Sequence, residues 1–430
     1  MSYIESDRKF IWHPFTHQKH AEDNLFIEKA EGAWLYDDQG KRYLDAISSW
    51  WVNIHGHAHP KIAGAISKQA SRLEHIIFAG FTHKPAIELA EKLIPLLPGD
   101  FSKVFYSDNG STATEVALKM SVQYWWNKSG KDNSRTRRKI LAFRNSYHGD
   151  TFGAMSVSDR GVFTMAFHEL LFEVLFIDTP TPENIEAILK TIDQEGHNTA
   201  CFIYEPLVQG AGGMKMYSAS LLDKIIEKAR QYEVICIADE VMTGFGRTGK
   251  LFASEYMVQK PDIICLSKGL TGGSLPLSIT ACSEKIHDAY VQDDRTMTFF
   301  HGHSYTANPI ACAAAVASLE LLQEEKCHQA IQRISDANTK FSQEIGDQLL
   351  PLSNIRTLGT ILAFEVDDTR HEYLNVAGHI IGRTAMEKGL YIRPLGNTVY
   401  LMPPYCISPE ESAFMYTVLT DSLFRAIGNW

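Results

Sequence analysis

The chain has 430 residues, of which 45% are apolar and 21% are charged, and its net charge at pH 7 is −10. This composition excludes the disordered and fibrous classes, and the negative balance argues against a nucleic-acid binder, which needs a basic face. The first ten residues lack the apolar core of a signal peptide and no run approaches 18 apolar residues. We therefore expect neither a signal peptide nor a membrane span.

The N-terminal part of the chain contains a hairpin pattern. Two short apolar runs, 33–36 and 42–47, flank the turn sequence Asp37-Asp-Gln-Gly40. A glycine at such a turn between two apolar runs predicts a β-hairpin.

From about residue 80 to residue 300, helical and strand patterns alternate. Helices are predicted over 85–97, 111–128, 183–195 and 218–232, and strands over 103–107, 139–143, 172–178, 199–205, 234–239, 262–267 and 277–282. This alternation predicts a largely parallel sheet with helices on both faces. The run 234–238 is apolar at every position, as expected of a strand that is buried on both faces.

The C-terminal third of the chain has a different pattern. A helix rich in small residues is predicted over 309–322, followed by strands near 360–366, 390–393 and 398–402. We expect an α/β fold with a large mostly parallel-sheet domain over 56–322. A small α+β domain is expected to combine both chain ends, 1–55 and 323–430.

The cysteine count indicates a reducing compartment. The seven cysteines are an odd number, none forms a Cys-x-x-Cys pair, and most lie in apolar runs. We predict reduced thiols in a cytoplasmic protein. The cysteines are Cys201, Cys236, Cys265, Cys282, Cys312, Cys327 and Cys406.

A strand, a glycine turn and a helix start occur together in Asp108-Asn-Gly-Ser-Thr-Ala-Thr-Glu-Val-Ala-Leu-Lys119. Ser111 or Thr112 is expected to cap the helix. The free N–H groups and hydroxyls of such a helix start suit a phosphate, although an ordinary capped helix would give the same pattern.

Three charged residues lie at the ends of apolar strands. Asp239 and Glu240 follow 234–238, at the strand end where α/β proteins bind ligands, although a carboxylate there can also be a simple cap. Lys268 ends the next strand and precedes a glycine. A lysine held at a buried strand end can lose its proton and act as a nucleophile, whereas the alternative is a lysine that extends to solvent.

Two further motifs resemble sites of other kinds. Gly244-Phe-Gly-Arg-Thr-Gly-Lys-Leu251 is similar to a P-loop, but leucine stands where a hydroxyl must bind Mg²⁺, which argues against an ATPase. His55-Gly-His-Ala-His59 and His301-Gly-His303 lack the carboxylates or cysteines of a usual metal site. We therefore expect no metal site.

Taken together, the motifs resemble the fold-type I, class III family of pyridoxal-phosphate aminotransferases over nearly the whole chain. Within this family the closer signatures are similar to members that act in biotin synthesis. These signatures are Trp12-His-Pro-Phe-Thr16, Ser48-Ser-Trp-Trp51, His55-Gly-His57, Tyr147-His-Gly-Asp-Thr151, Gln209-Gly-Ala-Gly-Gly213, Gly244-Phe-Gly-Arg-Thr-Gly249, His301-Gly302, Arg393-Pro394 and Tyr400-Leu-Met-Pro-Pro404.

The resemblance implies pyridoxal 5′-phosphate as the cofactor and assigns catalytic roles. Lys268 would hold the cofactor covalently and move protons, and Asp239 would bond its ring nitrogen. Tyr147 would cover one face of the ring. Gly110 and Ser111 would hold the phosphate.

The resemblance also implies a homodimer with shared active sites. Ser304 matches the hydroxyl that such enzymes send to the phosphate in the partner subunit, and His303 lies beside it. The reaction implied is transfer of an amino group to 8-amino-7-oxononanoate, which gives 7,8-diaminononanoate.

Substrate-binding positions follow by the same resemblance. Arg393 would bind the carboxylate of the acceptor, because a guanidinium suits bidentate recognition. The full set expected to bind substrate is Phe15, Trp50, Tyr147, Arg247, Gly302, Arg393 and Tyr400. For the aromatic members, core packing is the alternative explanation.

Two departures from the family pattern concern the amino donor. Members that use S-adenosylmethionine usually have tyrosine where this chain has Phe15, and Gly-Pro-Thr where it has Gly302-His-Ser304. The segment Phe299-Phe-His-Gly-His-Ser-Tyr305 resembles members that take L-lysine. The donor is therefore expected to be one of these two.

Three alternatives remain open from the sequence. Another class III enzyme, such as an ω-amino acid aminotransferase or an aminomutase, would use the same lysine and aspartate. An ATP-binding protein could use the loop 244–250. A catalytically idle binding protein would retain the fold without the reaction.

Overall fold

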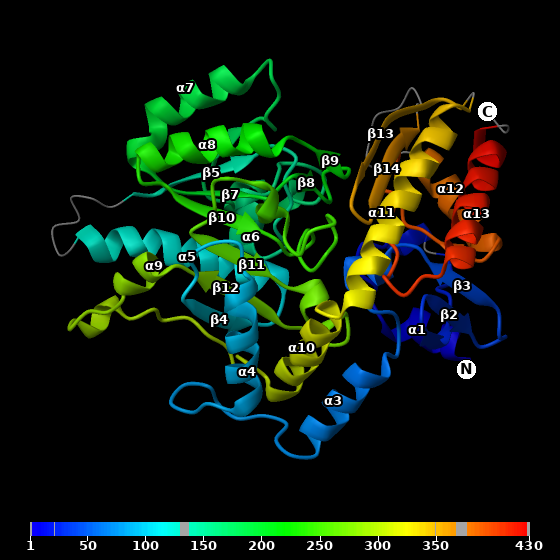
Figure 1. The fold of residues 1–430 in the computed structure, drawn as a ribbon, viewed down its shortest axis with the longest axis horizontal. Helices are drawn as coiled ribbons and strands as arrows, with labels where there is room; N and C mark the ends of the chain where they lie inside the picture. Colours follow the sequence, from blue (N-terminus) through cyan, green and yellow to red (C-terminus); the bar gives the residue numbers. More distant parts are fainter. Residues whose placement is uncertain (1, 21, 130–136, 349, 367–375, 428–430) are drawn as a thin grey trace.

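The computed structural model describes residues 2–20, 22–129, 137–348, 350–366 and 376–427. Its centre is a seven-stranded sheet in the order β4-β12-β11-β10-β7-β5-β6 (Figure 1). The strands are β4 (Lys103–Ser107), β5 (Lys139–Phe143), β6 (Leu175–Ile177), β7 (Thr199–Tyr204), β10 (Ile235–Asp239), β11 (Ile263–Leu266) and β12 (Ser278–Cys282). β12 pairs antiparallel with both of its neighbours, and the other pairs in this sheet are parallel. The predicted mostly parallel sheet is confirmed.

Alternate residues of the central strands enter two different cores. In β10, Cys236 and Ala238 pack with residues of α8, whereas Ile235 and Ile237 pack with residues of α5. Because both faces are covered, the strand is apolar at nearly every position. The helices of this part are α4 (Lys84–Leu93), α5 (Gly110–Ser129), α6 (Phe152–Val157), α7 (Ile185–Glu195), α8 (Ala219–Gln231), α9 (Glu284–Asp288) and α10 (Pro309–Leu322).

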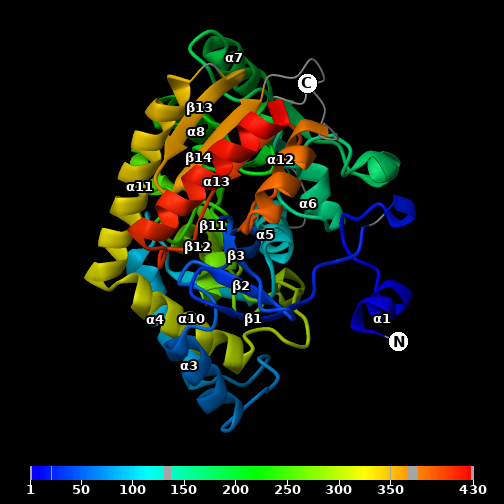
Figure 2. The ribbon, with the colours of Figure 1, turned by 90° about the vertical axis from the view of Figure 1, so that its right-hand side faces the viewer.

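The two ends of the chain form a second unit beside the large sheet (Figures 1 and 2). The predicted hairpin is confirmed as β2 (Trp34–Asp37) and β3 (Arg42–Asp45), which pair antiparallel. They belong to the sheet β1-β2-β3-β15, in which β15 (Leu390–Tyr391) pairs parallel with β3. This pairing joins the C-terminal part of the chain to the N-terminal part.

The remaining elements complete this unit and its connection to the large sheet. A three-stranded sheet, β13-β14-β16, packs against α11, while α12 packs against α13. The bounds are α1 (Tyr3–Phe10), β1 (Ile27–Glu31), α2 (Ser48–Trp51), α3 (Pro60–Ala70), β8 (Val208–Gln209), β9 (Lys215–Met216), α11 (Glu325–Gly346), β13 (Leu352–Leu358), β14 (Ile361–Val366), α12 (Val376–Glu387), β16 (Thr398–Leu401) and α13 (Pro409–Ile427). In the described part of the chain, no helix has the length and apolar character needed to cross a membrane.

Candidate active site

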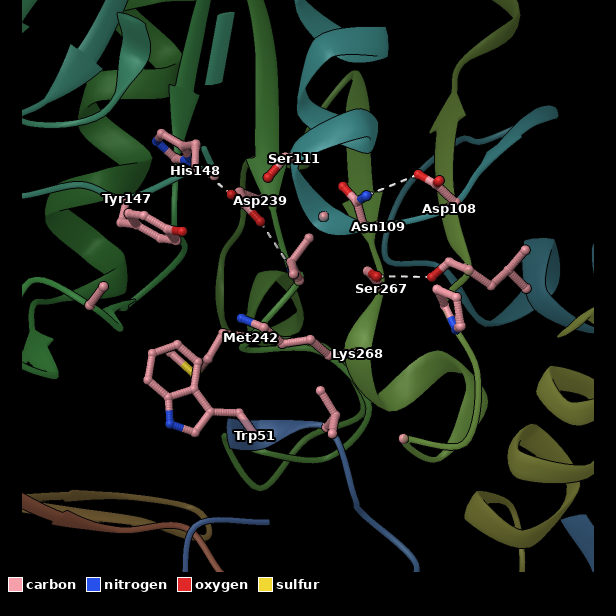
Figure 3. A pocket seen from close by; sticks show the side chains of 18 of the residues that line it. Trp51, Asp108, Asn109, Ser111, Tyr147, His148, Asp239, Met242, Ser267 and Lys268 are labelled. Atoms are coloured by element: carbon pink, nitrogen blue, oxygen red, sulfur yellow. Dashed lines mark hydrogen bonds and ion pairs between the residues drawn. The ribbon is translucent and has the colours of Figure 1, made fainter. Parts of the chain in front are cut away.

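The ends of neighbouring strands bring an aspartate and a lysine to one cavity. Asp239 is the last residue of β10, and Lys268 follows β11 as the first residue of the 3₁₀ turn η7 (Lys268–Thr271). β10 and β11 pair parallel, so their carboxyl ends lie at the same edge of the sheet. Both residues line a cavity of about 390 Å³, together with Trp51, Tyr147 and Ser111 (Figure 3).

Lys268 has the properties of a reactive amine. Its backbone has a φ of 49°, in the left-handed region that non-glycine residues rarely adopt. Its Nζ lies 4.5 Å from the centre of the Trp51 ring. Burial lowers the pKa of Lys268 from 10.5 to about 8, although the nearby Asp239 and Glu205 carboxylates oppose this shift. A neutral amine can attack an aldehyde, and burial makes this form accessible near neutral pH.

The Asp239 carboxylate is held by two donors. His148 Nδ1 lies 2.7 Å from Asp239 Oδ2, and the backbone N–H of Val241 donates to Oδ1 at 3.1 Å. A carboxylate can only accept, so His148 Nδ1 must carry the proton. His148 Nε2 is buried without a hydrogen-bond partner among the described residues. The carboxylate is therefore held in place at the wall of the cavity, where it can keep a proton on a ring nitrogen.

The start of α5 forms the opposite end of the cavity. The structure corrects the expected cap: Asn109, not Ser111 or Thr112, caps this helix, since its Oδ1 accepts the N–H of Thr112 at 3.0 Å. Ser111 Oγ instead accepts the N–H of Asp150 at 3.1 Å. A Cβ on Gly149 would lie 2.1 Å from that hydroxyl, so only glycine fits beside it. The first-turn N–H groups, which have no partner within a helix, suit a phosphate here.

Glu205 is a cavity residue that the sequence analysis missed. Its Oε1 accepts the N–H of Tyr147 at 3.0 Å and its Oε2 accepts the N–H of Gly210 at 2.8 Å. Burial raises the pKa of Glu205 to about 7. Glu205 directly follows β7, as Asp239 ends β10, so the strand-end rule could have found it. His148 was also missed as a site residue, although it follows Tyr147 in a quoted motif.

A cluster of aromatic side chains and an arginine lies next to the cavity. Phe15 and Trp50 meet edge to face with ring centres 5.3 Å apart, and the Arg393 guanidinium lies 4.7 Å from the Trp50 ring. Phe163 lies between Phe15 and Tyr147, with ring centres 5.9 and 6.2 Å away, respectively. Through Phe163, the expected acceptor-binding residues are therefore in contact with Tyr147, whose ring would cover the cofactor.

Trp50 and Trp51 belong to a left-handed turn. The four residues of α2 (Ser48–Trp51) have φ values of 51°, 45°, 69° and 74°. For residues with a Cβ this conformation costs roughly 1–2 kcal/mol each. Such a turn persists only where the surroundings enforce it.

Of the seven residues expected to bind substrate, only Tyr147 lines the cavity. Two of the others, Arg247 and Tyr400, are buried. Arg247 is 1% exposed, and its guanidinium donates to the carbonyl of Pro403 at 2.9 Å and to that of Trp51 at 3.2 Å. Arg247 Nε has no hydrogen-bond partner among the described residues, and donor binding by Arg247 stays a prediction. Tyr400 is also 1% exposed, and its hydroxyl accepts from Trp51 Nε1 at 3.0 Å. Tyr400 therefore supports Trp51 from behind.

The segment expected to contact a partner subunit also lies outside this cavity. Gly302, His303 and Ser304 are not among the residues that line it. Ser304 is exposed, whereas His303 is half-buried and its Nδ1 accepts the N–H of Tyr305 at 3.2 Å.

The motifs that resembled other sites have structural roles. Glu240 does not line the cavity, and its carboxylate accepts from the Thr243 hydroxyl at 2.7 Å and from the N–H of Ser254 at 2.7 Å. It therefore holds the loop that contains 244–251 in place. His55 bonds the Ser318 hydroxyl at 3.1 Å, and His57 bonds Asp45 at 2.9 Å. Both histidines are thus engaged within the protein.

The residues of the cavity fit pyridoxal phosphate. Lys268 Nζ has no hydrogen-bond partner in the described part of the chain, and Lys268 lines the same cavity as Asp239 and the first residues of α5. The site thus offers an amine for an aldehyde, a carboxylate for a ring nitrogen and N–H groups for a phosphate. Tyr147 supplies an aromatic surface at the side.

The sequence of the chain is similar to those of known aminotransferases. The profile of the family described as "Aminotransferase class-III" matches residues 16–423. A protein of Synechococcus elongatus named adenosylmethionine-8-amino-7-oxononanoate aminotransferase is 47% identical over 423 residues, which are 96% of this chain and 98% of that protein. A protein of the same name from Helicobacter pylori is 39% identical, over 94% of each chain.

Solved structures give the same result. Adenosylmethionine-8-amino-7-oxononanoate aminotransferase from Methanocaldococcus jannaschii is 35% identical with a TM-score of 0.92, covering 99% of this chain and 98% of that one. An omega transaminase from Pseudomonas jessenii, solved in complex with PMP, is 26% identical with a TM-score of 0.93, covering 100% and 99%.

Proposed function

Because the chain belongs to the class-III aminotransferases, we propose that it transfers an amino group to 8-amino-7-oxononanoate and so forms 7,8-diaminononanoate for biotin synthesis. The enzyme is an aminotransferase that uses pyridoxal phosphate. The observation that supports the proposal is that Lys268 and Asp239 line the same cavity. The cluster of Phe15, Trp50 and Arg393 lies next to this cavity.

Each residue of the cavity has a proposed task. When bound, pyridoxal phosphate supplies an electron-accepting ring for the negative charge that develops on the substrate carbon. In the first half of the reaction Lys268 Nζ would move the proton from the donor's carbon to the cofactor, and in the second half it would move a proton from the cofactor to the carbonyl carbon of the acceptor. Asp239 keeps a proton on the ring nitrogen, and Tyr147 packs on the ring. Gly110 and Ser111 bind the phosphate.

The acceptor is proposed to lie along the aromatic cluster. Arg393 binds its carboxylate, and Phe15 and Trp50 line its aliphatic chain. Gly302 would lie close to the substrate from a second copy of the chain.

The proposed assembly is a homodimer in which Ser304 and His303 of one copy complete the phosphate site of the other. Sedimentation velocity checks this, since a monomer that binds the cofactor normally would contradict it. The free thiols support a cytoplasmic location.

The donor is tested by a half-reaction on the cofactor-loaded protein. S-adenosylmethionine and L-lysine are added separately, and loss of the yellow colour reports transfer of the amino group. Bleaching by S-adenosylmethionine alone would make Phe15 and His303 neutral variations, and the Phe15→Tyr variant should then behave like the wild type. Bleaching by L-lysine alone would make these two positions the donor switch, because tyrosine adds one hydroxyl with a hydrogen bond of about 1 kcal/mol. If neither donor acts, the proposed reaction is wrong.

A second candidate is an ω-amino acid aminotransferase. The likeness to the omega transaminase of Pseudomonas jessenii favours it, although that protein is 26% identical and the Synechococcus protein is 47% identical. The two candidates can be distinguished with enzyme that has already received the amino group from a donor and has lost its yellow colour. Colour should return with 8-amino-7-oxononanoate under the first proposal, and with a short keto acid such as pyruvate under the second.

The pKa of Lys268 predicts how cofactor uptake depends on pH. Because burial lowers this pKa from 10.5 to about 8, about a tenth of the amine is neutral at pH 7, against less than about a thousandth for an ordinary lysine. The rate at which the cofactor-free protein binds pyridoxal phosphate should therefore rise up to about pH 8 and then level off. Stopped-flow absorbance measures this rate, and a rise that continues to pH 10 would contradict the shift.

A further inference from the structure

The left-handed turn α2 places two adjacent tryptophans at two different parts of the site. The Trp51 ring lies 4.5 Å from the Lys268 amine, where the reaction occurs. The Trp50 ring lies beneath the Arg393 guanidinium, at 4.7 Å, where the acceptor carboxylate is proposed to bind. The turn therefore fixes the position of the carboxylate end of the site relative to its reactive end.

This turn is opposed by its own backbone preference, so other groups must hold it. Asp45 is fully buried at the end of β3, and its Oδ2 accepts from Ser49 Oγ at 2.7 Å and from His57 Nε2 at 2.9 Å. Its Oδ1 accepts the N–H of Ile47, which precedes the turn, at 3.3 Å. One carboxylate thus contacts the residue before the turn, a residue within it and a histidine after it.

Both ring nitrogens of this histidine take part in hydrogen bonds. Since the Asp45 carboxylate can only accept, His57 Nε2 carries the proton, and Nδ1 then accepts from Asn53 Nδ2 at 2.9 Å. Ser48 Oγ adds a bond to the carbonyl of Met402 at 2.8 Å, which joins the turn to the C-terminal part of the chain. Hydrogen bonds to a buried carboxylate are among the strong ones.

We propose that Asp45, Ser49 and His57 are positioning residues that hold the left-handed turn and so set the enzyme's affinity for its long acceptor. The acceptor part of this inference rests on the proposed function. The positions of Trp50 and Trp51 do not depend on the proposed function, so they can be measured separately.

The test uses Ser49, whose hydroxyl can be removed without emptying the core. Ser49→Ala should raise the KM for 8-amino-7-oxononanoate about tenfold while kcat stays within about twofold, because the hydroxyl contacts Asp45 and not the reacting atoms. Ser49→Asn should remain within about threefold of the wild type, since asparagine tolerates a positive φ and can still donate to Asp45. Asn354→Ala is the matched control. Asn354 is an exposed residue of β13 and, like Ser49, is a non-glycine residue of positive φ, here 50°.

Fluorine NMR of the holoenzyme labelled with 5-fluorotryptophan provides a readout that is independent of turnover. The chain has seven tryptophans, and the signals of Trp50 and Trp51 are assigned by their replacement with phenylalanine. Ser49→Ala should shift or broaden these two signals and leave the others in place. Asn354→Ala should move none of them.

The outcomes separate the two claims. Unmoved signals in Ser49→Ala would overturn the positioning role. Moved signals with an unchanged acceptor KM would overturn the link to substrate affinity. If the wild type does not aminate 8-amino-7-oxononanoate, the proposed function fails, while the fluorine signals still decide the role of Asp45, Ser49 and His57.

Discussion

Replacing Lys268 by alanine is expected to abolish turnover, with a loss of at least about 10⁴-fold in kcat. The structure places no other lysine among the described residues that line the cavity, so no other amine is in place to move the proton. The rate is measured under single-turnover conditions with an excess of the variant, so that product release does not limit it. The fold should persist, because the Lys268 side chain makes no hydrogen bond in the described part of the chain.

The matched control for this variant is Lys250→Ala. Lys250 is exposed and does not line the cavity, and its amine lies 4.4 Å from the Tyr256 ring. The Lys250→Ala variant should retain the kcat and KM of the wild type. Circular dichroism and the midpoint of thermal unfolding should show both variants folded. A Lys268→Ala enzyme that keeps more than about a hundredth of the wild-type rate would refute the assignment.

Asp239→Asn is expected to lower kcat by about two to four orders of magnitude. The amide has almost the same shape as the carboxylate, and one oxygen can still accept from His148 or from the N–H of Val241. The change therefore removes the negative charge, and with it the group that keeps the ring nitrogen protonated.

A second readout checks the same variant without turnover. The Asp239 carboxylate raises the pKa of Lys268, against the effect of burial. Its removal should move the midpoint of cofactor uptake below about pH 8, because the amine then loses its proton more easily. Asp178→Asn, which changes an exposed partner of Arg144, should leave both kcat and this midpoint in place. Unchanged kcat in Asp239→Asn would show that the carboxylate does not have the proposed role.

Strands and helices whose limits are set by their own residue pattern were predicted well from the sequence. The predicted strands 103–107 and 139–143 coincide with β4 and β5, and the predicted helix 309–322 coincides with α10, whose Asn308 side chain caps it. By contrast, β13 was not predicted. Most of its residues are half-buried, so it has no clear pattern, and its pairing with β14 defines it as a strand. The domain boundaries stay a prediction.

The candidate site was predictable to the extent that it follows strand ends. Asp239 and Lys268 both end apolar strands, and the rule for parallel sheets brings them together. The partnership of Asp45 with Ser49 and His57 could not be seen, because it depends on a turn that the residues disfavour. The burial of Arg247 could not be seen either, because a glycine-rich loop gives no sign that its arginine packs against backbone carbonyls.

The pairing of β3 with β15 has a consequence for the order of folding. Asp45 lies opposite Tyr391, near the other end of the chain, so the edge of β3 remains unpaired while most of the protein is being synthesised. Contacts between such distant segments form slowly, because a long loop must close first. The central sheet can assemble from segments that are closer together in the sequence, whereas the surroundings of α2 are complete only after the C-terminal strands arrive. A ribosome-bound chain that lacks these strands would thus hold Lys268 and Asp239 in a folded sheet before it has a finished place for the substrate.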